Sequence, residues 1–91
     1  MKRRELKEIL RKEVAKWSKQ SYHEMCQLDY PWVKDIGEGE VLYNVELDKL
    51  EDEPEYVHIS ISVCDTGLST FFPVSTSIIF RSDGTVDAPE V

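Results

Sequence analysis

The sequence predicts an α+β fold in which a long N-terminal amphipathic helix packs on one face of a three- to four-stranded antiparallel meander sheet. Two observations predict it: apolar residues recur at helical spacing in the first quarter of the chain, and they alternate with polar residues in later segments. The length of 91 residues suits a single domain with one core. Within residues 1–91 we expect a helix over about 2–25, a linker over 26–39, a sheet over 40–86 and a frayed tail over 87–91.

The N-terminal segment carries one apolar stripe. The residues on this stripe are Leu6, Leu10, Val14, Trp17, Ser21 and Met25, spaced three or four apart. Ser21 followed by Glu24 also fits a capping box, so a second short helix could begin there instead. The pattern does not separate a straight helix that continues through Ser21 from one that bends or restarts there. Helical structure should end before Pro31, because proline disfavours the helical conformation in the preceding residue.

The strands follow from alternation. Val41, Tyr43, Val45 and Leu47 alternate with polar residues, and Val57, Ile59, Ile61 and Val63 alternate with His58, Ser60 and Ser62, which face away from the core. Residues 75–81 form a third strand, and Asp83-Gly84 predicts a tight turn into a short return strand. The sheet needs a cover, and the N-terminal helix is the available one. We expect Trp17, Val45, Ile59 and Ile61 at the centre of the core.

Charge is unevenly distributed along the chain. Residues 1–20 hold eight cations and three acids, whereas residues 21–91 hold three cations and fifteen acids, for a net charge of −7. No apolar run approaches the roughly 20 residues that span a bilayer, and no secretory leader is recognisable. We therefore expect a cytoplasmic protein without membrane contact. In that compartment Cys26 and Cys64 should be reduced thiols.

Several short motifs resemble a group of small bacterial proteins of uncharacterised activity. The motifs are Leu10-Arg11-Lys12-Glu13, Ser21-Tyr22-His23-Glu24, Tyr43-Asn44-Val45-Glu46, Phe71-Phe72-Pro73-Val74, Ser77-Ile78-Ile79 and Asp83-Gly84. Where similar proteins often have paired acids before a glycine, this chain has Cys64-Asp65-Thr66-Gly67. The resemblance implies a helix followed by an antiparallel sheet. It implies no activity, cofactor or partner.

Metal binding and cysteine chemistry are weakly supported. His23 and Cys26 stand three apart on a helix, a spacing that can present two zinc ligands. His58 and Cys64 share a strand face but lie about 20 Å apart, which prevents them from sharing an ion. The same separation prevents His58 from activating Cys64, so only His23 remains as a base for that thiol. We expect no catalytic residue, no metal and no cofactor.

Two charged segments are better explained as solvated surface. Asp48, Glu51, Asp52, Glu53 and Glu55 are nearly contiguous and include Pro54, unlike the alternating acids and glycine of a calcium loop. The basic helix could approach phosphates, but the acidic remainder of the chain would repel a nucleic acid. We therefore do not expect nucleic-acid binding.

The remaining interpretation is a non-enzymatic protein-interaction or regulatory module, as a homodimer or with another protein. Phe71, Phe72, Trp32 and Tyr30 are the candidate interface residues, because exposed aromatics dominate interface energetics. The competing hypothesis is that they cap the ends of a small core. A second hypothesis is a small-ligand binder or enzyme whose helix–sheet pocket contains Tyr22, His23, Trp32 and His58. A third is an immunity- or antitoxin-like protein that neutralises a basic partner.

Overall fold

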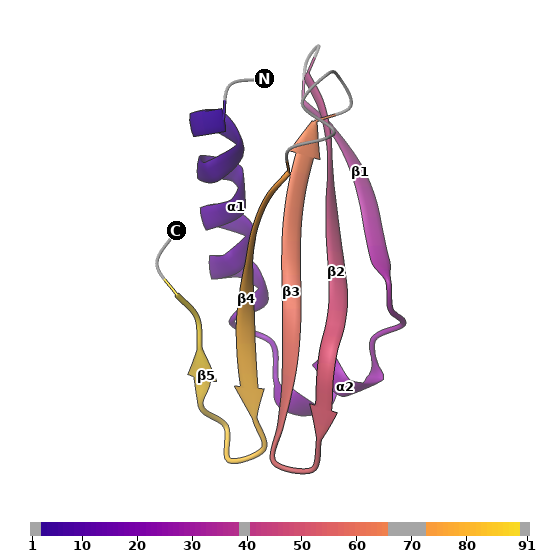
Figure 1. Ribbon diagram of the computed structural model, residues 1–91, viewed down its shortest axis with the longest axis vertical. Coiled ribbons are helices and arrows are strands. Elements are labelled where there is room, and N and C mark those ends of the chain that lie inside the picture. The colour runs from indigo at the N-terminus through magenta and orange to yellow at the C-terminus, as the bar shows by residue number, and fades with distance from the viewer. Residues whose placement is uncertain (1–2, 39–40, 66–72, 90–91) are drawn as a thin grey trace.

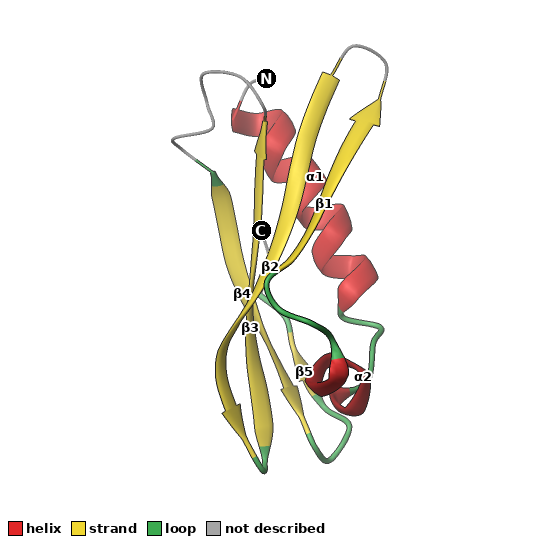
Figure 2. Ribbon diagram, turned by 90° about the vertical axis from the view of Figure 1, so that its right-hand side faces the viewer, coloured by secondary structure: helices red, strands yellow, loops and turns green. Residues whose placement is uncertain are grey.

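The computed structural model describes residues 3–38, 41–65 and 73–89. Its elements are α1 (Arg3–Trp17), α2 (Tyr22–Gln27), β1 (Trp32–Glu38), β2 (Val41–Glu53), β3 (Tyr56–Asp65), β4 (Val74–Arg81) and β5 (Val86–Asp87). The strands form one antiparallel sheet in the order β1-β2-β3-β4-β5 (Figure 1). Both helices contact β3 and β4, and they lie on the same side of the sheet (Figure 2). The α+β class and the helix-on-sheet arrangement are confirmed, with five strands in place of three or four.

The helix expected over 2–25 is two helices. α1 ends at Trp17, and α2 begins after Ser21 with both halves of a capping box. The Ser21 hydroxyl accepts a hydrogen bond from the Glu24 amide at 3.1 Å, and the Glu24 carboxylate accepts one from the Ser21 amide at 3.2 Å. These bonds satisfy two amide groups at the start of α2, which favours a new helix over a continuation. Met25 of α2 is nonetheless buried in the same core.

The expected linker over 26–39 contains an edge strand, β1. Trp32, Lys34 and Ile36 lie opposite Leu47, Val45 and Tyr43 of β2, so they belong to the side of the sheet that carries the helices. The alternation was concealed because Lys34 occupies an inward position and Val33 is 53% exposed on the outward side. An edge strand tolerates such exceptions, since it is less enclosed than a central strand.

The core lies between the helices and the central strands. Its buried side chains are Leu6, Leu10, Val14 and Trp17 of α1, Met25 of α2, and Tyr43, Val45, Leu47, Val57, Ile59, Ile61, Val63, Val74, Ile78 and Phe80 of the sheet. The predicted centre is confirmed: Val45 and Ile61 are fully buried, Ile59 is 1% exposed and Trp17 is 9% exposed. The residue spacing that predicted the helical stripe and the strand alternation therefore located most of the core.

A β-bulge in β2 changes which side chains face the helices. The register with β3 shifts between Lys49 and Glu51, so Leu50 is the extra residue. Glu51 consequently pairs with His58 on the side away from the helices, and Leu50 is 54% exposed. The acidic residues 51–53, expected as solvated surface, form the end of this strand.

Candidate functional site: the open face of the sheet

The sheet face opposite the helices is the main surface feature of the protein. We call it the open face, because within the described residues both helices contact the other side. The strand register assigns to it the side chains of Asn44, Glu46, Asp48, Glu51 and Glu53 in β2, of Tyr56, His58, Ser60, Ser62 and Cys64 in β3, and of Ser75, Ser77, Ile79 and Arg81 in β4. This assignment extends the predicted outward orientation of His58, Ser60 and Ser62.

The strands that form the open face differ in the charge and in the size of their outward side chains. In one row across the sheet Glu46 lies opposite Ser62, which in turn lies opposite Ser75. In the next row Asp48 lies opposite Ser60, and Ser60 lies opposite Ser77. A column of acids on β2 therefore borders two columns of short hydroxyl side chains on β3 and β4. The serine columns leave the sheet backbone close to the surface.

Glu46 and Asp48 are the most unusual pair on this face. They project from the same side of β2, two residues apart, and among the described residues neither forms an ion pair with a cation. Partial burial, followed by the negative charge of Asp48 and a hydrogen bond with it, raises the pKa of Glu46 above its ordinary value. Glu46 was not singled out from the sequence, and Asp48 was treated only as part of a solvated acidic segment, although their alternation with Val45 and Leu47 was the signal that places them outward.

At the end of the open face near the β2–β3 turn, the side chains contact one another. The Tyr56 hydroxyl donates a hydrogen bond to Glu51 Oε2 at 2.6 Å, and His58 Nδ1 lies 3.7 Å from Glu51 Oε1. The hydrogen bond to Glu51 is the main reason that the pKa of Tyr56 is raised. Glu51 is therefore contacted by a tyrosine hydroxyl and a histidine ring, whereas Glu46 and Asp48 contact each other.

The cysteine on the open face is poorly suited to nucleophilic chemistry. Cys64 Sγ donates a hydrogen bond to Asn44 Oδ1 at 2.9 Å. Desolvation raises the pKa of the Cys64 thiol, which favours the protonated, unreactive form. His58 is six residues away on β3, and His23 lies on α2, on the other side of the sheet. The candidate bases and this thiol are therefore not brought together.

The predicted pocket residues are divided between two places. Tyr22 and His23 line a groove of about 450 Å³ between the α1–α2 turn and the β4–β5 hairpin. His58 and Trp32 do not line this groove, and His58 belongs to the open face. Arg81 also lines this groove, although the register assigns its side chain to the open face, where its guanidinium lies 3.5 Å from Asp87 Oδ2.

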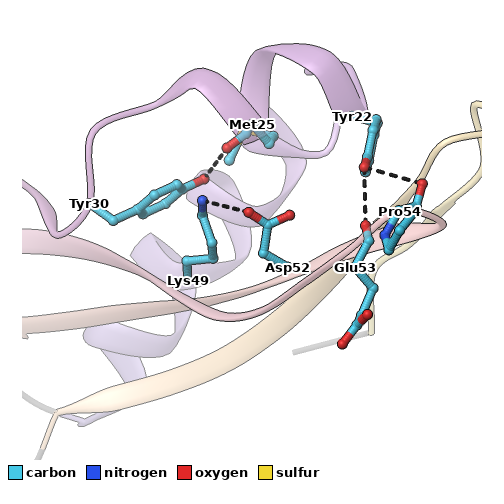
Figure 3. Close-up of polar contacts among 7 residues, drawn as sticks. All are labelled: Tyr22, Met25, Tyr30, Lys49, Asp52, Glu53 and Pro54. Atoms are coloured by element: carbon cyan, nitrogen blue, oxygen red, sulfur yellow. Dashed lines mark hydrogen bonds and ion pairs between the residues drawn. The ribbon is translucent and has the colours of Figure 1, made fainter.

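Two of the predicted interface aromatics pack within the protein. The Trp32 ring meets the Trp17 ring edge-on, with centroids 4.8 Å apart. The Tyr30 hydroxyl donates a hydrogen bond to the Met25 carbonyl at 2.7 Å, and Lys49 Nζ lies 5.4 Å from the Tyr30 ring centroid (Figure 3). Burial raises the pKa of Tyr30 to about 12, so this hydroxyl remains a donor at neutral pH. The other two, Phe71 and Phe72, lie outside the described residues.

Clustered metal ligands and long apolar helices are both absent from the described part of the chain. There, no three His, Cys, Asp or Glu side chains gather in a group that could hold a metal ion. Cys26 and Cys64 are both free thiols, half-buried on different elements. Neither α1 nor α2 has the length and apolar character that a bilayer-crossing helix requires.

Comparisons with known proteins add no family to these observations. Searches of the chain against protein-family models, curated proteins and solved structures give no significant match.

Proposed function

We propose that this protein is a non-enzymatic protein-binding module that engages its partner through the open face. The observation that carries the proposal is the contrast between the two sides of the sheet. One side is covered by α1 and α2, whereas the described residues place no element over the other. The aromatic residues that first suggested an interface give less support, because Tyr30 and Trp32 pack against the core.

The shape of the open face also suits a polypeptide partner. Ser60, Ser62 and Ser77 are half-buried in the sheet surface and carry short side chains. A helix or strand of a partner can approach such a surface closely and form hydrogen bonds with the hydroxyl groups.

Site-specific photo-crosslinking in cells tests this proposal. A photoreactive amino acid at Ser60 reports on the open face, and one at Lys12, exposed on α1, serves as the matched control. We expect a discrete crosslinked protein from position 60 that position 12 does not give. The captured protein, purified and mixed with this one, should bind the wild type and lose binding to Ser60→Arg. Crosslinking from position 12 alone would contradict the proposal.

A small-ligand function is a second candidate, supported by the groove that contains Tyr22 and His23. Its volume of about 450 Å³ lies within the range of small-molecule sites. Screening a fragment library by NMR, with the His23 ring protons as reporters, tests it directly. A ligand that shifts these signals and loses affinity in Tyr22→Ala would favour this candidate. Shifts confined to the open face would not.

A further inference from the structure

We infer that the partner of the open face is a cationic polypeptide segment, one that places arginine or lysine side chains against Glu46 and Asp48. This inference rests on the proposed function and adds the chemistry of the partner. It follows from three features of the described residues: the unbalanced acids of β2, the low serine columns beside them, and the opposite charge on the other side of the molecule.

The acids of β2 form the receptor for the cations. Glu46 and Asp48 carry like charges on the same strand face, without an ion pair in the described residues. A guanidinium group placed between them would relieve their mutual repulsion and provide hydrogen-bond donors for both carboxylates. The adjacent Ser60 and Ser62 would then lie beneath the partner backbone, because they are the direct cross-strand neighbours of the two acids.

The charge distribution of the whole molecule selects the same face. Helix α1 carries exposed cations at Arg3, Arg4, Lys7, Arg11, Lys12 and Lys16. A cationic segment is therefore repelled by the helix side and attracted to the open face, an arrangement that steers the partner during encounter. A nucleic acid would meet the opposite preference and would avoid the acids of β2.

A second copy of this chain is a poorer occupant. Two open faces packed against each other would oppose two surfaces on which the acids of β2 outnumber the cations, and such like-charge contacts are unfavourable. Packing α1 of one copy on the open face of the next would match the charges. That contact is head-to-tail, however, and unless its rotation closes a ring it continues into an open-ended assembly.

The sequence offers a specific reporter for the test. Asn44 is the only asparagine in the chain and lies on the open face, whereas the only glutamines, Gln20 and Gln27, belong to the α1–α2 turn and to α2. The side-chain amide signals of these three residues thus report separately on the two sides. The probe is a 16-residue Ala/Arg amphipathic peptide titrated into ¹⁵N-labelled protein, with a Gln-for-Arg peptide of the same design as its control.

We expect the arginine peptide to shift the Asn44 amide signals and to leave those of Gln20 and Gln27 unchanged. The double variant Glu46→Gln/Asp48→Asn should weaken binding about tenfold at low salt and flatten its salt dependence. The matched control Glu5→Gln/Asp29→Asn removes the same net charge from exposed positions off the open face and should retain wild-type affinity.

Other outcomes overturn the inference in distinguishable ways. Equal binding of both peptides at Asn44 would leave the open face as a docking surface and reject a cationic partner. Equal weakening of peptide binding by the two double variants would mean that the net charge of the protein, and not the position of Glu46 and Asp48, determines the affinity. Binding of duplex DNA but not of the arginine peptide, or concentration-dependent assembly of the protein alone, would replace the cationic polypeptide with another occupant.

Discussion

The two faces of β3 differ more than any other two regions of the protein. On one face Val57, Ile61 and Val63 are fully buried beneath the helices, and Ile59 is 1% exposed. On the other face, only one residue away along the strand, the side chains are no more than half-buried, and Ser60 and Ser62 at its centre are small and polar. The difference concerns stability: the helix-covered face supplies the buried apolar side chains of β3, whereas the open face, which we propose as the binding surface, supplies none of the fully buried ones.

Truncation on either face of β3 should produce the largest contrast. Ile61→Ala removes buried methyl groups from the helix-covered face and should lower the free energy of unfolding by about 2–5 kcal/mol. Ser62→Ala, on the open face, should change it by less than about 0.5 kcal/mol. Urea unfolding followed by circular dichroism measures both. A comparable loss for the serine variant would mean that the open face also contributes to the core.

The next contrast concerns two tyrosine hydroxyl groups, one on the helix-covered side of the sheet and one on the open face. Tyr30→Phe leaves the Met25 carbonyl without its 2.7 Å donor and should cost about 1 kcal/mol. Tyr56→Phe, which removes the hydrogen bond to the exposed Glu51 carboxylate, should cost less. Thermal unfolding of the two variants tests the order. The reverse order would show that the polar contacts of the open face are more important for stability than those around α2.

Removing the charge of Glu46 should stabilise the folded protein, whereas most substitutions destabilise it. The raised pKa means that the folded protein binds a proton on Glu46 more tightly than the unfolded chain does, so stability falls as pH rises from the ordinary value of 4.5 through the folded value. Glu46→Gln should therefore be more stable than the wild type at pH 7, and the difference should shrink as pH falls toward 4.5. Unfolding titrations at several pH values measure this. A destabilised variant at neutral pH would contradict the electrostatic argument.

The smallest effect is expected far from both faces, in the β4–β5 turn. Asp83 Oδ1 accepts hydrogen bonds from the Thr85 amide at 2.9 Å and from its hydroxyl at 2.7 Å, and these bonds lower the pKa of Asp83. The stability they provide is present above the unfolded pKa and is lost as pH falls through the folded one. Asp83→Ala should be slightly destabilised at pH 7 and should match the wild type at low pH, as measured by thermal unfolding.

The sequence predicted the fold where a segment has a regular spacing of apolar residues, and it failed where that spacing is interrupted or where several strands are needed. Regular apolar spacing located the core in Leu6–Trp17 and in Val57–Val63, because each of these segments has one buried face. The break before Ser21 did not disturb the apolar spacing, because α1 and α2 pack against the same sheet. β1 was missed because Lys34 takes an inward position at the edge. The open face required the register of three strands, which alternation within one strand does not provide.

The β-bulge at Leu50 has a consequence for how the length of this chain can vary among related sequences. With Leu50 deleted, Lys49 would still pair with Ile59, and Glu51 would take the next position opposite His58 without a change of side. Sequences that lack this one residue should therefore align to β2 with a gap at position 50 and an unchanged alternation on both flanks. A gap elsewhere in β2 would exchange inward and outward side chains over the rest of the strand, so insertions and deletions should concentrate at this position.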